Sequence, residues 1–155
     1  MRMILVECNP DEYIISTLGF NSKKIKHQQG KGKVLLGLKK EKGTIGMIDE
    51  DPGKSRVPLI EEFEIKEEGE RTSLLEHRVN GAHLIVIKPD LETWLLEIAR
   101  ANHIKPSEYG LPGDPNRLHS IIHPERNAKY RKMVEKLIEL DEEMQMVSRW
   151  IKNNI

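Results

Sequence analysis

The chain has 155 residues, the length of one ordinary domain, and its 25 Lys and Arg residues balance 25 Asp and Glu residues, so its total charge predicts no bulk attraction to nucleic acid or membrane. The single cysteine, Cys8, excludes an intramolecular disulfide and a cysteine-based zinc site and is typical of a reducing compartment. Because no apolar run approaches the roughly 20 residues that span a bilayer, we expect a cytoplasmic protein without membrane association.

Short apolar runs alternate with helical patterns in the first third of the chain. The run at 3–6 has the form of a strand buried on both faces, and it ends at Glu7. In chain order, the predicted elements are a strand at 3–6, a helix from Asn9 or Asp11 to Gly19, a strand at 24–27, a helix that opens within 28–33, and a strand at 44–48. This alternation predicts an open, mostly parallel α/β sheet.

The rest of the chain adds an antiparallel hairpin and further helices. Asn80-Gly81 lies between two strand patterns and is a strong signal for a short hairpin turn. The expected elements are a loop-rich excursion over 51–71 with a short exposed helix in "LIEEFEIKEEGE", strands at 72–79 and 83–87, a helix from Asp90 through Ile98, and helices after the turn "EYGLPGDPN". We expect an α/β domain over 1–105 and a helical C-terminal extension over 106–155 that packs on it.

An apolar stripe runs along the C-terminal segment in alternating steps of three and four residues. Its members are Tyr130, Met133, Leu137, Leu140, Met144, Val147 and Ile151. Such spacing is typical of a heptad seam. Two interpretations stay open: the stripe packs on the chain's own sheet or on a neighbouring helix, or it joins two copies of the chain as a homodimer.

Acidic side chains follow two of the predicted strands, at the edge where open α/β sheets bind ligands. Glu7 closes the first strand, and Asp49 and Asp51 close the third. Because side chains alternate along extended backbone, the two aspartates are expected on one face and Glu50 on the other. If the two strands are neighbours, Glu7 faces the aspartate pair. Convergent carboxylates favour Mg²⁺ or Mn²⁺, which take oxygen ligands; the alternative is a solvated acidic turn.

Two segments resemble the Toprim domain, the topoisomerase-primase module. "MILVECNPDEYIISTLG" is similar to its opening, in which a hydrophobic strand ends in a Glu before a helix, and "IGMIDEDPG" is similar to its Asp-x-Asp motif. The resemblance covers about residues 1–55 and implies a Toprim-like Rossmannoid fold. It also implies that Glu7 acts as a general acid or base while Asp49 and Asp51 hold Mg²⁺ during nucleotidyl transfer or phosphodiester cleavage. One departure is Cys8, which stands where the family commonly has Gly.

A third segment, "IKPDLETWLLE", resembles a strand-Pro-x-x-Glu-x-Trp-Leu-Leu stretch of small stand-alone Toprim-like proteins. This resemblance implies that Glu92 reaches the same rim of the sheet and joins Glu7, Asp49 and Asp51 as a metal ligand. The alternative is structural, because Asp90 as N-cap and Glu92 in the first turn both stabilise the start of a helix.

A basic stretch, "NSKKIKHQQGKGKVLLGLKK", contains no acidic residue. Its segment 30–33 lies at an expected helix start, where exposed N–H groups and the helix dipole favour an anion. We expect Lys31 and Lys33, with Lys26 and His27 beside them, to contact nucleic-acid phosphate near the metal. The spacing is not that of a Walker motif, and the alternative is a solvated, lysine-rich helix face.

Together these features predict Mg²⁺- or Mn²⁺-dependent phosphodiester chemistry on nucleic acid, by a nuclease or a nucleotidyl transferase whose catalytic residues are Glu7, Asp49 and Asp51. Two alternatives stay open. The chain is a catalytically silent nucleic-acid- or partner-binding module of the same fold, or it is an interaction subunit that assembles through its C-terminal seam. The sequence does not distinguish DNA from RNA, or cleavage from synthesis.

Overall fold

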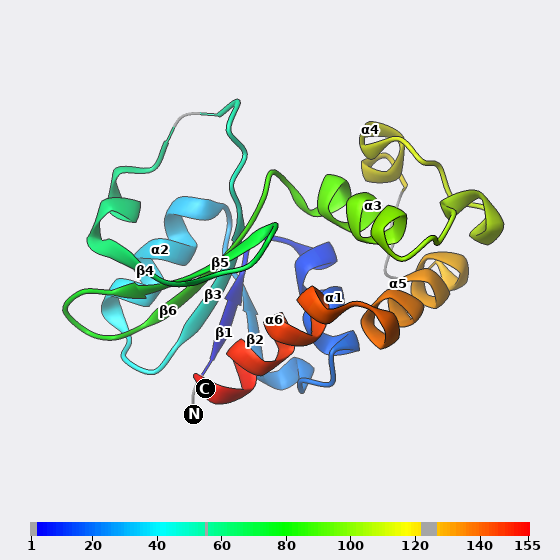
Figure 1. Ribbon diagram of the computed structural model, residues 1–155. Helices are drawn as coiled ribbons and strands as arrows, with labels where there is room; N and C mark the ends of the chain where they lie inside the picture. Colours follow the sequence, from blue (N-terminus) through cyan, green and yellow to red (C-terminus); the bar gives the residue numbers. More distant parts are fainter. Residues whose placement is uncertain (1–2, 55, 122–126) are drawn as a thin grey trace.

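The computed structural model describes residues 3–54, 56–121 and 127–155, and these form three layers with a sheet in the middle (Figure 1). The sheet has six strands in the order β2-β1-β3-β6-β5-β4. The strands are β1 (Ile4–Val6), β2 (Ile25–His27), β3 (Ile45–Asp49), β4 (Phe63–Glu68), β5 (Thr72–His77) and β6 (His83–Ile87). The α-helices are α1 (Asn9–Thr17), α2 (Lys31–Lys40), α3 (Leu91–Ala101), α4 (Pro115–His119), α5 (Ala128–Leu140) and α6 (Glu142–Asn153). The 3₁₀ helices are η1 (Ser22–Lys24), η2 (Pro58–Glu62) and η3 (Pro106–Tyr109).

The sheet is mixed but mostly parallel. Parallel ladders join β2 to β1, β1 to β3 and β3 to β6, while antiparallel ladders join β6 to β5 and β5 to β4. The predicted open α/β sheet and its antiparallel hairpin are therefore confirmed, and the first and third strands are neighbours, the condition under which Glu7 was expected to face the aspartates. The connection between the two strands is longer than the expected 80–82, because β5 ends at His77, whose amide donates to the Ala82 carbonyl at 2.7 Å.

The acidic segment "LIEEFEIKEEGE" was expected as a helix, and this expectation is wrong. It contains the end of η2 and the edge strand β4, in which Phe63 lies opposite His77 and Ile65 opposite Leu75 of β5. Phe63 is buried, whereas the rest of β4 is exposed and largely acidic. Pairing with β5 thus outweighs the local helix preference of the acidic residues. This pairing depends on a strand elsewhere in the chain, so the segment's own sequence does not predict it.

Two hydrophobic cores lie on the two faces of the sheet. α2 and the segment 57–63 cover one face, and α1, α3, α5 and α6 cover the other, as Figure 1 shows. Gly46 of β3 allows α2 to approach closely, because a Cβ atom there would lie 2.8 Å from Val34 and 2.9 Å from Leu38. The helix that opens at 31 is thereby fixed directly above the strand that delivers the acidic residues.

The C-terminal stripe belongs to two helices rather than to one continuous heptad seam. The chain leaves the helical conformation at Asp141, whose side chain accepts a hydrogen bond from the Met144 amide at 3.0 Å and caps α6. The stripe is buried in the same core as β1 and β3, except for Leu140, which is 42% exposed. Packing of the stripe within the chain is therefore confirmed, and the homodimer stays a prediction.

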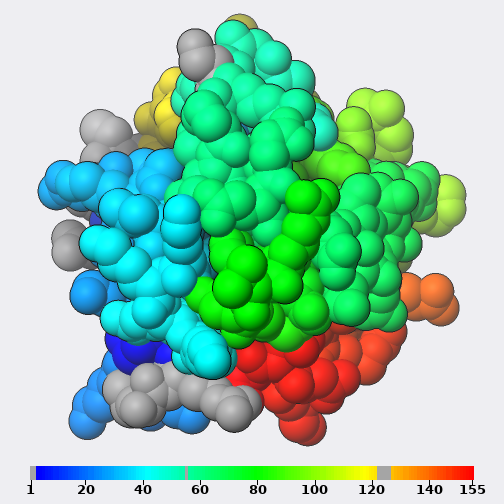
Figure 2. Space-filling view, turned by 90° about the vertical axis from the view of Figure 1, so that its left-hand side faces the viewer, coloured from blue at the N-terminus to red at the C-terminus, as the bar shows by residue number. Residues whose placement is uncertain are grey.

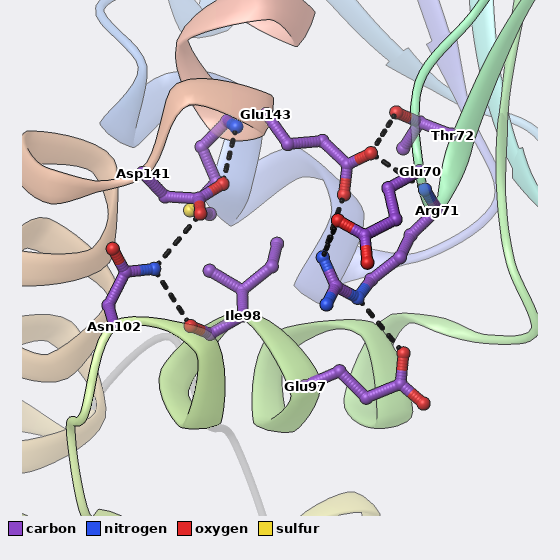
Figure 3. Close-up of polar contacts among 9 residues, drawn as sticks. Glu70, Arg71, Thr72, Glu97, Ile98, Asn102, Asp141 and Glu143 are labelled. Carbon is purple, nitrogen blue, oxygen red and sulfur yellow. Dashed lines mark hydrogen bonds and ion pairs between the residues drawn. The ribbon is translucent and has the colours of Figure 1, made fainter.

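A network of ion pairs and hydrogen bonds joins β5 to α3 and α6 (Figure 3). Arg71 Nε donates to Glu97 Oε2 at 3.1 Å, and Arg71 Nη1 lies 3.5 Å from Glu143 Oε1. Glu143 also accepts hydrogen bonds from the Arg71 amide at 2.7 Å and from the Thr72 hydroxyl at 3.3 Å. The C-terminal helices thus share with the rest of the chain both a hydrophobic core and a polar network.

Candidate functional site

Glu7 and Asp49 meet at the carboxyl edge of the parallel strands. Val6 lies opposite Met47 in the ladder between β1 and β3, so Glu7, which directly follows β1, lies near Asp49, the last residue of β3. Glu7 Oε1 accepts a hydrogen bond from the Asp49 amide at 3.1 Å. Burial raises the pKa of Glu7, although that hydrogen bond and the charge of Lys31 oppose the rise. The structure therefore brings the two strand-end acids together.

Asp51 adopts a left-handed backbone conformation, with φ of 48°. Its amide donates to the Pro89 carbonyl at 2.8 Å, which holds the turn against the end of β6. Because the extended conformation does not continue to Asp51, the alternation that was expected to place it on one face with Asp49 does not apply. The Asp51 carboxylate lies 3.9 Å from the ammonium groups of both Lys31 and Lys54.

Asp11, which the sequence reasoning did not include among the site residues, lies beside these acids. It sits in the first turn of α1, is only 2% exposed, and accepts a hydrogen bond on Oδ2 from the Cys8 thiol at 3.3 Å. Its Oδ1 atom has no hydrogen-bond partner within the described ranges. Burial raises the pKa of Asp11 to about 7, and the charges of Glu7 and Glu92 act in the same direction.

The carboxylate of Asp49 is held next to Asp11. Burial raises the pKa of Asp49 to about 8, and the charge of Asp11 contributes more to the rise than the charges of Glu7 and Asp51. Its Oδ1 atom is also buried, again without a partner in the described part of the chain. Burial and the neighbouring charges thus favour the protonated form of both acids, and a bound divalent cation would favour the carboxylates.

The expected phosphate-binding lysines occupy different environments. Lys31 Nζ donates to the Glu50 carbonyl oxygen at 2.8 Å, so it lies at the acidic edge and is already engaged there. Lys33 is exposed, with its ammonium group 3.5 Å from Gln29 Oε1. Both belong to the first turn of α2, next to Gly30, whose φ of 102° favours glycine at the N-cap.

Lys26 and His27 lie on β2, on the far side of β1 from β3. Lys26 is exposed, and His27 Nε2 contacts the carboxylate of Glu12 on α1. The recorded contact of His27 is thus with α1, while Lys31 contacts the Glu50 carbonyl after β3.

Glu92 stands in the first turn of α3, as predicted. Its Oε1 atom lies 3.0 Å from His119 Nδ1 of α4. Burial is the main cause of the raised pKa of Tyr130 and of Asp11, and the Glu92 charge acts in the same direction. Asp90 caps the helix by accepting a hydrogen bond from the Thr93 amide at 2.8 Å. The structural roles expected of Asp90 as N-cap and of Glu92 in the first turn are thus both present.

Cys8 is the N-cap of α1 and has extended backbone, with φ of −153° and ψ of 173°. Any residue adopts this conformation, so glycine is not required there. Cys8 is an exposed residue, not a buried one, but partial burial of its thiol and the neighbouring Asp11 carboxylate raise the pKa of the sulphur. The thiol therefore stays protonated and acts as a hydrogen-bond donor rather than as a nucleophile.

Carboxylate oxygens are suitable ligands for a hard cation, but these carboxylates do not point toward one common position. Among the residues the structure describes, no three Asp, Glu, His or Cys side chains are arranged to hold a metal ion. Glu7 is turned toward the Asp49 amide, Asp51 toward Lys31, and Asp11 toward Cys8. The oxygen donors and the two partnerless Oδ1 atoms suit Mg²⁺ or Mn²⁺ once these side chains turn toward a common point.

Comparison of the chain with protein-family models, with curated proteins and with solved structures found no match. Within the described ranges, every helix is too short or too polar to cross a membrane.

Proposed function

We propose that this protein performs Mg²⁺- or Mn²⁺-dependent phosphodiester chemistry on nucleic acid in the cytoplasm, as a nuclease or a nucleotidyl transferase of Toprim-like fold. The main support is the proximity of Glu7, Asp11 and Asp49 at one sheet edge, where two buried carboxylate oxygens have no hydrogen-bond partner among the described residues. Such crowding raises the free energy of the ionised acids, and a divalent cation relieves it. The strand order, with acids after the adjacent strands β1 and β3, is consistent with this proposal.

The residues at this edge take distinct roles in the proposed reaction. Asp49 and Asp51 hold the cation, and Asp11 is a further ligand. A cation held there would supply Lewis-acid chemistry, polarising a phosphoryl oxygen and offsetting negative charge in the transition state. Glu7 accepts or donates the proton of the attacking or leaving oxygen, a role for which a raised pKa is suitable. Lys33, which is exposed next to the site, contacts a phosphate of the nucleic acid.

Thermal melts combined with a product assay test the proposal. Millimolar Mn²⁺ should raise the melting temperature of the wild-type protein relative to EDTA and should be required for products from single- or double-stranded DNA or RNA. Asp49→Asn should lose both effects, and Glu7→Gln should lose the product. Glu50→Gln, an exposed acid in the same turn, is the matched control and should retain both. A wild-type protein that gains no stability from either ion would overturn the proposal.

A second candidate is a catalytically silent module that binds nucleic acid or a partner. One observation in its favour is that no three of the described carboxylates are arranged as a metal site. Another is that Lys31 already donates a hydrogen bond to the Glu50 carbonyl. Binding of DNA or RNA with EDTA present, without metal-dependent products, would select this candidate. In that case Lys33→Ala should flatten the log–log salt dependence of binding by roughly one unit.

A further inference from the structure

A pocket of about 460 Å³ adjoins the carboxyl edge, within the range of about 300–1,000 Å³ typical of small-ligand sites. It lies on the face covered by α2 and by the segment that follows β3, which is the face turned toward the viewer in Figure 2. Ile48, Val86 and Leu75, from the adjacent strands β3, β6 and β5, form its apolar floor. Ile65 of the edge strand β4 lines its outer side and is 59% exposed.

The polar lining of this pocket is mixed in charge. Its cations are Lys31, Lys54, Arg56 and Lys88, and its acids are Glu50 together with Asp49 and Asp51 of the candidate metal site. Ser73 is the polar residue of the floor; it is 2% exposed, and its hydroxyl lies 3.5 Å from Glu68 Oε1. The pocket therefore joins an aliphatic surface directly to cations and to the carboxylates proposed to hold a metal.

We propose that this pocket holds the nucleoside adjoining the reacting phosphate, with its base packed on the aliphatic floor. The proposal rests on the proposed function, because it places the phosphate of that nucleotide at the cation that Asp49 and Asp51 are proposed to hold. With a cation held at Asp49 and Asp51, the four basic residues of the lining suit an anion, and the apolar floor suits a flat or compact apolar group attached to it. No aromatic side chain is among the described residues that line the pocket, so the base is held by aliphatic contact and not by ring stacking.

The test compares a phosphate with and without a base. Calorimetric titration in millimolar Mn²⁺ measures the affinities of adenosine 5′-monophosphate, uridine 5′-monophosphate and ribose 5-phosphate. The nucleotides should bind the wild-type protein at least about tenfold more tightly, because the base removes apolar surface of the floor from water. Ile65→Thr keeps the β-branched shape at an exposed position and should reduce this ratio at least about threefold. Val79→Thr, at a residue 88% exposed in the hairpin loop, should leave the ratio unchanged.

The outcomes separate this inference from the function on which it rests. If ribose 5-phosphate binds in a Mn²⁺-dependent manner as tightly as the nucleotides, the metal and phosphate site stands and the base pocket is overturned. If Ile65→Thr weakens all three ligands equally, or acts no differently from Val79→Thr, the pocket does not hold the base. If none of the three phosphates binds in a Mn²⁺-dependent manner, the proposed function itself fails and the inference falls with it.

Discussion

Asp49→Asn tests the buried acid pair directly, because the amide has nearly the shape of the protonated acid and does not ionise. The pKa of Asp49 is raised from an ordinary 3.8 to about 8 in the folded protein, so the folded state keeps a proton that the unfolded chain has lost. This contribution to stability is fully present below the unfolded pKa and is lost as the pH rises through the folded pKa. At about 1.4 kcal/mol per pKa unit, the wild-type protein would lose at most about 6 kcal/mol of its free energy of unfolding as the pH rises. Because the site is partly exposed and can relax, we expect a loss of about 2 kcal/mol.

Urea unfolding in EDTA, followed by circular dichroism, measures this effect. Between about pH 5 and pH 8.5 the free energy of unfolding of the wild-type protein should fall by about 2 kcal/mol relative to Asp49→Asn. Millimolar Mn²⁺ at the higher pH should reverse the order, since an ion at a hundredfold excess over its Kd stabilises the wild type by about 2.7 kcal/mol. Glu50→Gln, which removes an exposed charge, should follow the wild type. A difference between wild type and Asp49→Asn that is the same at both pH values would refute the reasoning.

Three further substitutions test packing and assembly. Arg71→Met leaves the Glu143 carboxylate, 8% exposed, without its ion pair, and urea unfolding should show a loss of about 3 kcal/mol; a loss near zero would mean that water replaces the arginine. Asn80→Ala removes two side-chain hydrogen bonds of 2.8 Å to carbonyls near the end of α2 and should cost about 1–2 kcal/mol in the same assay. A loss near zero would mean that water binds these carbonyls equally well. Leu140→Asp, at a position 42% exposed, should change stability by less than about 0.5 kcal/mol. A fall in solution mass by light scattering in this variant would instead support the homodimer seam.

The parts of the fold that could be predicted are those with a strong local signal. The apolar run before Glu7 and the apolar run before Asp49 each indicate a strand, and an acid at the end of each of two neighbouring parallel strands must lie at one edge. The helix caps follow from equally local chemistry, as the Asp90 side chain shows. The mixed sheet and the proximity of Glu7 to Asp49 can therefore be predicted from short sequence segments.

The missed features depend on distant parts of the chain. Asp11 was taken as a helix-start residue, which its place in the first turn of α1 justifies. A signal was available, since Asp11 precedes the buried Ile14 and Ile15 by three and four residues and so lies on the apolar face of the helix. The strand character of β4 and the left-handed conformation of Asp51 carried no such signal, because both are set by pairing with β5 and by contact with the end of β6.

The two outer strands of the sheet bear on how this protein avoids aggregation. An open strand edge offers unpaired N–H and C=O groups to any other extended chain, and proteins discourage this with short strands, charges and bulges. On one side β2 has only three residues, among them Lys26 and His27. On the other side β4 is rich in glutamate, and its register with β5 shifts between Ile65 and Glu67. Both edges therefore oppose growth of the sheet into a larger one, and any self-association is expected through helical surfaces.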